Sequence, residues 1–370
     1  MDFKIIFWKI RGMNDFDKQV AVKNLILSQR CAICLIQETK MHSMTDWFVR
    51  QLWYDENFGW AYVPSNGYSG GILTIWDSSR LEKLDEIFGM NNITSLFSTR
   101  ANNFQWDIYN VYSPCDYEPR RDFWQNMAEV REWWTSPICI AGDMNAIHSN
   151  EQRNHGDGDS RNTATLNSYI LDNELIDQPL IGGAYTWSNN QVDPLLCRLD
   201  RFLFSHDFEE AFPNALQVVL TRTISYHNPI LVISEPILPS KPYFKLDRLW
   251  LEHKDLARNV QMWWGRLSYT GSASTRFFLK LQNLKHLIKP WRKQHYGHVS
   301  RDRNDLTARI HEFNILEETV RLQHNQVEER TQYKLKLRNI EVMEAKKWNL
   351  RSKQNNFLGG EIRILDTFIV

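Results

Sequence analysis

The stretch Ile138-Cys139-Ile140-Ala141-Gly142-Asp143-Met144-Asn145 places two polar side chains directly after an apolar run. An apolar run that ends in a glycine is typical of a buried strand followed by a turn. Because side chains alternate along an extended chain, Asp143 and Asn145 are predicted to point to the same side. A carboxylate and an amide at a strand end can hold a water molecule and a phosphate oxygen together. The alternative is a solvated turn, and other segments of the chain decide between the two.

Length and cysteine content limit the class of protein. The chain has 370 residues, which is enough for one large or two smaller domains. Cys31 and Cys34 form a CxxC pair, but no second Cys or His pair follows at zinc spacing, so packing in the core is predicted for them. The sequence shows no disulfide pattern, signal peptide or membrane-spanning run. We therefore expect a nuclear or cytoplasmic protein that is not secreted and has no membrane partner.

Charge is unevenly distributed, although the chain has 44 basic and 44 acidic residues. Residues 276–354 carry 18 Lys and Arg against 9 Asp and Glu, whereas residues 1–275 carry 25 against 33. An acidic body with a basic tail predicts a polyanion as partner of the tail, and RNA is one candidate. Because acidic residues are mixed into the tail, a solvated helical connector is the alternative.

Polar side chains at the ends of apolar strands recur in the first 235 residues. A buried strand over 31–36 leads into Glu38, as the run from residue 138 leads into Asp143. Further strands are predicted over 2–10, 61–63, 68–76, 104–111, 185–188, 197–204 and 230–233, and helices over 18–29, 120–134 and 163–173. Strands interspersed with helices predict an α/β protein with a two-layered β core covered by helices.

Six motif residues occur in the order that they have in the endonuclease/exonuclease/phosphatase superfamily, which the chain resembles. They are Glu38 in QET, Tyr112 in NVYSP, Asp143 and Asn145 in GDMN, Asp200 in RLDRF, and His227 before Asn-Pro-Ile. The passages GGAYTWSNNQ, RLDRFLFS and HNPIL are similar to the endonuclease domain of plant LINE-type (non-LTR) retrotransposon polyproteins. The resemblance covers about residues 1–235. It implies a four-layer α/β sandwich, two packed β-sheets flanked by helices, that cleaves a DNA phosphodiester with Mg²⁺, or alternatively Mn²⁺.

The resemblance also implies the roles of the carboxylates that follow the strands. Glu38 would hold Mg²⁺, a hard cation that prefers carboxylate oxygens and stabilises charge on the phosphate and leaving group. Asp143 would accept the proton of the attacking water. Asn145 would fix the water and the phosphate by hydrogen bonds.

A second group of residues is expected to contact the phosphate from the other side. His227 would donate a hydrogen bond to a non-bridging oxygen, and Asp200 would orient the ring and favour its charged form. By the same resemblance, Tyr112, Thr186 and Ser225 are expected to lie at the phosphate or the DNA.

Two positions depart from the family pattern. The first motif of the family reads WN, but this chain has Trp8-Lys9, which puts a cation where the metal is expected. The family's SDH is Ser225-Tyr226-His227 here, so that a carboxylate is lost and bulk is gained at Tyr226. Both changes are expected to impair activity and to leave the fold intact.

The C-terminal third is expected to divide into three parts. Residues 236–274 read as a Pro-rich linker and a short helical passage, and residues 275–356 as a basic helical or coiled-coil region. Interruptions of the helix are predicted near Pro290 and near Tyr296-Gly297-His298. Residues 357–370 read as a frameshifted tail, because codons for 361–369 shifted by one nucleotide can spell Gly-Asp-Lys-Asn-Thr-Arg-Tyr-Phe-His.

The sequence thus predicts a metal-dependent endonuclease domain that nicks DNA and is impaired in this copy. The first alternative is a catalytically inactive relic or DNA-binding module of the same fold. The second is a phosphatase of the superfamily that acts on a small phosphorylated ligand.

Overall fold

The computed structural model describes residues 3–67, 69–234 and 253–357. The chain forms two compact units, one of Met1–Pro236 with Thr307–Val370 and the other of Ile237–Leu306. The predicted Pro-rich linker at 236–242 and the predicted frameshifted tail from residue 358 onward lie outside the described residues.

The larger sheet of the first unit brings the ends of two central strands together. Its strands are β1 (Lys4–Lys9), β2 (Ile33–Gln37), β3 (Phe58–Asn66), β4 (Ser69–Asp77), β10 (Leu180–Ile181), β14 (Leu216–Val219) and β15 (Ile230–Ile233). Their order in space is β10-β14-β15-β1-β2-β4-β3. β1 runs parallel to β2 with Lys9 opposite Gln37. The carboxyl ends of both strands therefore lie at one edge, and Lys9 comes next to Glu38.

The second sheet places three polar residues in one row. Its strands are β5 (Leu81–Phe88), β6 (Asn92–Thr99), β7 (Gln105–Tyr112), β8 (Ile138–Asp143), β13 (Asp200–Ser205) and β9 (Leu175–Asp177), in this spatial order. The register pairs Tyr112 with Asp143 across β7 and β8, and Asp143 with Asp200 across β8 and β13. A separate two-stranded sheet is formed by β11 (Trp187–Ser188) and β12 (Leu196–Cys197).

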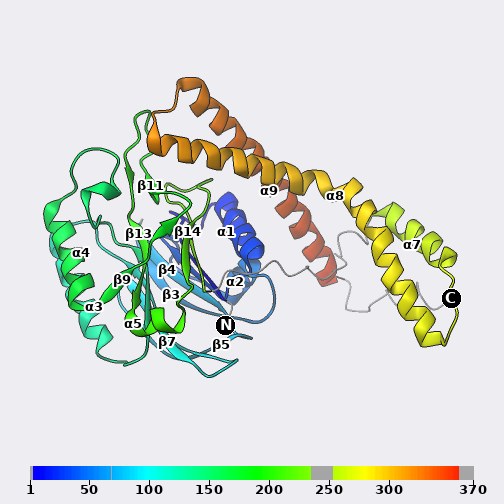
Figure 1. Cartoon of the computed structure of the whole chain (residues 1–370), viewed down its shortest axis with the longest axis horizontal. Coiled ribbons are helices and arrows are strands. Elements are labelled where there is room, and N and C mark those ends of the chain that lie inside the picture. Colours follow the sequence, from blue (N-terminus) through cyan, green and yellow to red (C-terminus); the bar gives the residue numbers. More distant parts are fainter. Residues whose placement is uncertain (1–2, 68, 235–252, 358–370) are drawn as a thin grey trace. The chain divides into compact units, whose positions relative to one another are not determined.

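Helices cover the outer faces of both sheets, and the sheets pack on each other (Figure 1). The helices of this part are α1 (Phe16–Gln29), α2 (Asp46–Leu52), α3 (Tyr117–Arg131), α4 (Ser160–Asp172) and α5 (His206–Ala211). Alternation along β1 sends Phe7 into the core between the sheets and Trp8 into the core beneath α1 and α2. The second sheet is covered by α3 and α4 in the same way. The predicted four-layer α/β sandwich is confirmed.

A continuous helix replaces the predicted interruptions in the tail. α7 (Lys254–Arg266) is followed by α8 (Ala273–Thr319), which runs through Pro290 without a break. The prediction of a break was wrong because proline removes only one backbone donor, and apolar residues on both sides of it keep the helix packed. Within the second unit, Ile288 and Trp291 flank the proline and pack with Leu256 of α7.

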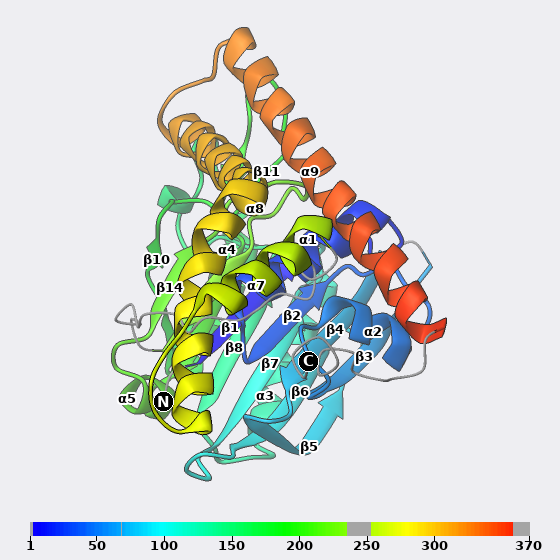
Figure 2. The same ribbon diagram turned by 90° about the vertical axis from the view of Figure 1, so that its right-hand side faces the viewer.

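The end of α8 and the helix α9 (His324–Phe357) belong to the first unit. α9 lies beside α1, as Figure 2 shows in red and blue, and Arg338 forms an ion pair with Asp17 of α1. A ring contact between Phe313 and Tyr333 joins the two helices. None of the helices in the described part of the chain is long and apolar enough to cross a membrane.

Candidate active site

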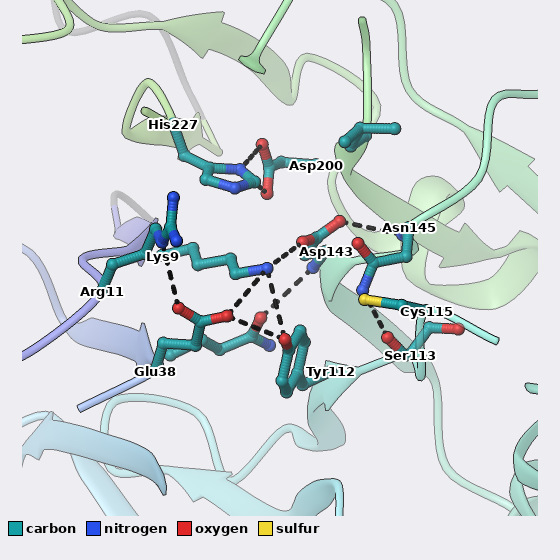
Figure 3. Close-up of polar contacts among 12 residues, drawn as sticks. Lys9, Arg11, Glu38, Tyr112, Ser113, Cys115, Asp143, Asn145, Asp200 and His227 are labelled. Atoms are coloured by element: carbon teal, nitrogen blue, oxygen red, sulfur yellow. Dashed lines mark hydrogen bonds and ion pairs between the residues drawn. The ribbon is translucent and has the colours of Figure 1, made fainter. Parts of the chain in front are cut away.

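The strand ends of both sheets converge on one cluster of polar side chains (Figure 3). The cluster consists of residues that the sequence singled out, namely Lys9, Glu38, Tyr112, Asp143, Asn145, Asp200 and His227. Four strands contribute to it, β1, β7, β8 and β13, because each delivers a polar residue at the same edge of the sandwich. The cluster is therefore a direct product of strand register.

His227 and Asp200 form a buried pair. The imidazole Nδ1 lies 2.8 Å from one carboxylate oxygen of Asp200 and 3.1 Å from the other. The His227 carbonyl accepts a hydrogen bond from the indole Nε1 of Trp8 at 3.0 Å, which fixes the backbone. Burial raises the pKa of Asp200, although the neighbouring imidazole opposes this shift. With Nδ1 engaged, Nε2 is the ring atom left for a ligand.

Lys9 lies between two carboxylates and is only 5% exposed. Its Nζ is 2.7 Å from Oδ2 of Asp143 and 3.3 Å from Oε1 of Glu38. The same ammonium lies 3.4 Å from the hydroxyl of Tyr112 and 4.5 Å from the centre of its ring. Burial opposes protonation, but the two carboxylates outweigh it and raise the pKa of Lys9 above its ordinary value. Lys9 is therefore a permanently charged centre of the cluster.

Both oxygens of Asp143 are occupied. Oδ2 binds Lys9, and Oδ1 accepts a hydrogen bond from the backbone N–H of Asn145 at 2.8 Å. Asn145 has a left-handed backbone with φ of 48°, and its side-chain amide donates to the Ser113 carbonyl at 2.5 Å. Burial favours the protonated form of Asp143, but Lys9, His227 and the backbone N–H of Asn145 together outweigh burial and lower the pKa of Asp143 below the ordinary value. Asp143 is thus held as a carboxylate and is a weakened base.

Glu38 closes the cluster on the side of the larger sheet. Its Oε1 accepts a hydrogen bond from the Tyr112 hydroxyl at 2.8 Å, and its Oε2 lies 3.5 Å from Nε of Arg11. Burial would raise the pKa of Glu38, but Lys9, Tyr112 and Arg11 together lower it. Burial also raises the pKa of the Tyr112 hydroxyl, which stays a hydrogen-bond donor.

Comparison with known protein families identifies the family of this chain. A model of the endonuclease/exonuclease/phosphatase family matches residues 7–227. The chain belongs to this family. No curated protein sequence matches the chain.

Solved structures of the endonuclease/exonuclease/phosphatase fold resemble the chain at low sequence identity. AP endonuclease LMAP from Leishmania major has a TM-score of 0.53 at 14% identity, covering 64% of this chain and 88% of that one. An AP endonuclease from Archaeoglobus fulgidus has a TM-score of 0.50 at 14% identity, covering 62% and 98%. The endonuclease domain of TRAS1, a telomere-specific non-LTR retrotransposon, has a TM-score of 0.49 at 13% identity, covering 64% and 99%. At these identities the likeness concerns the fold.

Endonuclease/exonuclease/phosphatase proteins usually depend on a divalent metal ion, and the residues here do not fit one as they stand. Glu38, the carboxylate expected to hold the ion, binds the ammonium of Lys9, and so does Asp143, the expected base. A divalent ion between them would meet this buried charge at close range. Ligand atoms of Asp143, Asp200 and His227 also lie within 4.8 Å of one another, but Nδ1 of His227 already binds Asp200.

Two other residues singled out in the sequence, Thr186 and Ser225, have mainly structural contacts. The Thr186 hydroxyl accepts hydrogen bonds from the backbone N–H groups of Leu199 and Asp200, each at 3.0 Å. Ser225 donates to the Lys9 carbonyl at 2.6 Å and accepts from the N–H of His227. Their predicted contacts with phosphate or DNA stay predictions.

Tyr226 lies at the rim of the cluster. Its side chain is 42% exposed, and the guanidinium of Arg11 lies 4.6 Å from its ring centre. Its carbonyl accepts a hydrogen bond from the backbone N–H of Ser188 at 3.1 Å. The ring thus adds bulk beside Arg11, while the carboxylate of the family pattern is missing.

Sequence reasoning overlooked Gln37 and Arg11. Gln37 is fully buried, and its amide donates to the Val111 carbonyl at 2.7 Å and to Oδ1 of Asn110 at 3.0 Å. It thereby joins the two sheets directly behind the cluster, next to the N–H of Asp143. A polar amide at the end of an otherwise apolar strand was the available signal, because buried polar groups need partners.

Proposed function

We propose that the first 235 residues are a DNA-nicking endonuclease domain derived from a non-LTR retrotransposon and that catalysis is impaired in this copy. The observation that carries the activity is the convergence of Asp143, Asp200 and His227, whose ligand atoms lie within 4.8 Å of one another. Family membership supports hydrolysis of a phosphate ester. The retrotransposon origin rests on the passages GGAYTWSNNQ, RLDRFLFS and HNPIL.

The geometry supports a role for His227 in binding a phosphate. Asp200 engages Nδ1, which leaves Nε2 to donate a hydrogen bond to a phosphate oxygen. Lys9 places an ammonium in the same cluster, but a phosphate would have to share its charge with Asp143 and Glu38. Phosphate recognition is therefore supported by residues from both sheets.

Proton abstraction is the step that the geometry supports least. A general base works best when its pKa lies near the working pH, whereas Lys9 lowers the pKa of Asp143 still further. The Asn145 amide uses one of its two N–H donors for the Ser113 carbonyl, which leaves its second N–H and its oxygen for a water or a phosphate. Mg²⁺, or Mn²⁺, remains the cation predicted by the family pattern, and Lys9 stands against its entry in this copy.

Retention of DNA binding without cleavage is the second candidate function. Lys9 favours it, because an ammonium can attract a phosphate but supplies no metal-bound water. The basic helices after residue 275 are proposed as a further contact to DNA or RNA. The boundary at residue 235, the nuclear or cytoplasmic location and the frameshifted tail likewise stay predictions.

A nicking assay on supercoiled plasmid tests the proposal. The parent is compared with Lys9→Asn plus Tyr226→Asp, and with a triple variant that adds Asp143→Ala. We expect slow or no nicking by the parent, a large gain in the double variant with Mg²⁺, and loss of that gain in the triple variant. A parent that nicks as fast as the double variant at limiting Mg²⁺ would contradict the impairment. Release of phosphate from an inositol phosphate without plasmid nicking would favour the phosphatase alternative.

A further inference from the structure

One turn of α8 contacts two loops. One loop carries the active-site His227, and the other carries Thr186, which binds the backbone N–H of Asp200, the partner of His227. The first loop spans residues 182–186 and ends in Thr186, just before β11, and the second spans 221–228 and contains His227. The loops are bonded to each other, since the N–H of Asn228 donates to the Thr186 carbonyl at 2.7 Å. A helix that holds both loops therefore also holds the pair of His227 and Asp200.

Glu318 of α8 fixes the first loop. Its Oε2 accepts a hydrogen bond from the backbone N–H of Ala184 at 2.9 Å. Gly183 packs so closely that a Cβ there would lie 3.0 Å from Oε1 of Glu318 and 2.9 Å from a Val219 methyl. Thr186 follows two residues later, and its hydroxyl accepts the N–H of Asp200 at 3.0 Å. The contact thus reaches Asp200 through a short hydrogen-bonded path.

Glu317 of α8 fixes the second loop through a buried charge cluster. It accepts from Arg222 at 3.0 Å and from Arg330 of α9 at 2.7 Å, and all three side chains are buried. Asn314 adds a hydrogen bond from its amide to the Arg222 carbonyl at 3.4 Å. Buried charges demand well-defined partners, so this cluster restricts the backbone at residue 222. His227 lies five residues further along the same loop.

We propose that Asn314, Glu317 and Glu318, held by Arg330, are positioning residues for the His227–Asp200 pair. The first unit then needs the helices after residue 306 to hold its active site, in addition to the two sheets. The role of the His227–Asp200 pair in catalysis rests on the proposed function, but the contacts of α8 with the two loops do not depend on any activity. Both loops leave regular secondary structure before they reach the site, which is why support from outside the sandwich matters.

Proton exchange at His227 tests the inference without a substrate. The full chain is labelled uniformly with ¹⁵N, and the signal of the Nδ1 proton that faces Asp200 is assigned by its loss in His227→Gln. Its exchange rate with water is then measured in Glu318→Ala and Glu317→Gln, with the amide proton of Ile140 in β8 as a reference for global opening. Arg338→Gln is the matched control, because it breaks an ion pair between α9 and α1 and leaves Asn314, Glu317 and Glu318 with their partners.

We expect exchange at His227 to become at least about tenfold faster in both glutamate variants, a local change that leaves Ile140 unaffected. The control should leave both signals unchanged. If Glu317→Gln fails to fold because two buried guanidinium groups lose their partner, Glu318→Ala decides the matter. The inference is overturned when a folded Glu318→Ala shows parental exchange at His227, or when His227 and Ile140 change in equal proportion. Absence of plasmid nicking affects only the proposed function.

Discussion

Replacing Lys9 by asparagine is expected to turn a metal-insensitive protein into one that is stabilised by Mg²⁺. At an effective dielectric constant of about 20, the charges of Lys9 and Asp143 at 2.7 Å attract by about 6 kcal/mol in gross terms. The contact with Glu38 at 3.3 Å adds about 5 kcal/mol, and desolvation of the three buried groups offsets most of this. Breaking a buried ion pair from one side costs about 3–5 kcal/mol, because the remaining charge loses its partner.

The loss should appear in the melting temperature. One kcal/mol corresponds to about 2–4 °C for a domain of this size, so Lys9→Asn in EDTA should melt about 6–20 °C below the parent. Two unpaired carboxylates then attract a divalent ion. Mg²⁺ at about 100 times its dissociation constant would raise the free energy of unfolding of Lys9→Asn by about 2.7 kcal/mol.

Differential scanning fluorimetry across a Mg²⁺ series measures both effects. Adding Asp143→Asn to Lys9→Asn should remove the Mg²⁺ response, and Lys83→Asn, which changes a lysine paired with Glu86 away from the site, should behave as the parent. Our reasoning fails if the melting temperature of the parent rises with Mg²⁺ as much as that of Lys9→Asn. It also fails if Lys9→Asn is as stable as the parent in EDTA.

Four further predictions concern single features. Burial raises the pKa of Asp107 to about 7, so ionisation of this carboxyl group destabilises the fold as pH rises from about 4 to 7. In urea titrations at pH 8, Asp107→Asn should raise the free energy of unfolding by about 1–2 kcal/mol. Burial and two arginines lower the pKa of Lys334 to about 7, so the free energy of unfolding should increase between pH 7 and 10. Lys334→Met should remove that increase and should raise the free energy of unfolding by about 1 kcal/mol at pH 6. Tyr226→Ala removes the stacking of Arg11 and should cost about 0.5–1 kcal/mol, with a larger loss arguing for hidden packing of the ring. Sequencing the coding DNA should reveal, one nucleotide out of frame, the continuation Gly-Asp-Lys-Asn-Thr-Arg-Tyr-Phe-His for residues 361–369, and its absence would refute the frameshift.

The sandwich was predictable because its central strands are continuous apolar runs that end in polar residues. β1, β2, β8 and β15 were all predicted from such runs, and the family pattern supplied the order of the motifs. β5 and β6 were overlooked, because β5 mixes charged and apolar residues and lies at the edge of its sheet. A strand with one exposed face gives a weaker pattern than one buried on both faces.

The residues that make up the site could be predicted from the sequence, but the contacts between them were less predictable. Lys9 was recognised as a departure, but its pairing with Asp143 joins residues 134 positions apart and depends on register between two sheets. The charge cluster of Arg222, Glu317 and Arg330 likewise depends on how α8 and α9 pack, which helical periodicity cannot specify. Glu38 and Asn145 adopt left-handed backbones, a local detail that only the surrounding contacts determine.

The ion pairs of Lys9 bear on how a gene of this kind could lose catalytic activity and still encode a folded protein. Asparagine and lysine codons differ only in their third base, so one point mutation converts the family's WN into the Trp8-Lys9 found here. The Lys9 ammonium binds both Glu38 and Asp143, the two carboxylates for which the family pattern predicts a role in catalysis. Under the proposed impairment, such a substitution would remove activity and leave a folded chain, which proteases that act on unfolded chains would not remove. A gene copy of this kind would then keep producing a well-folded protein without selection for its catalysis.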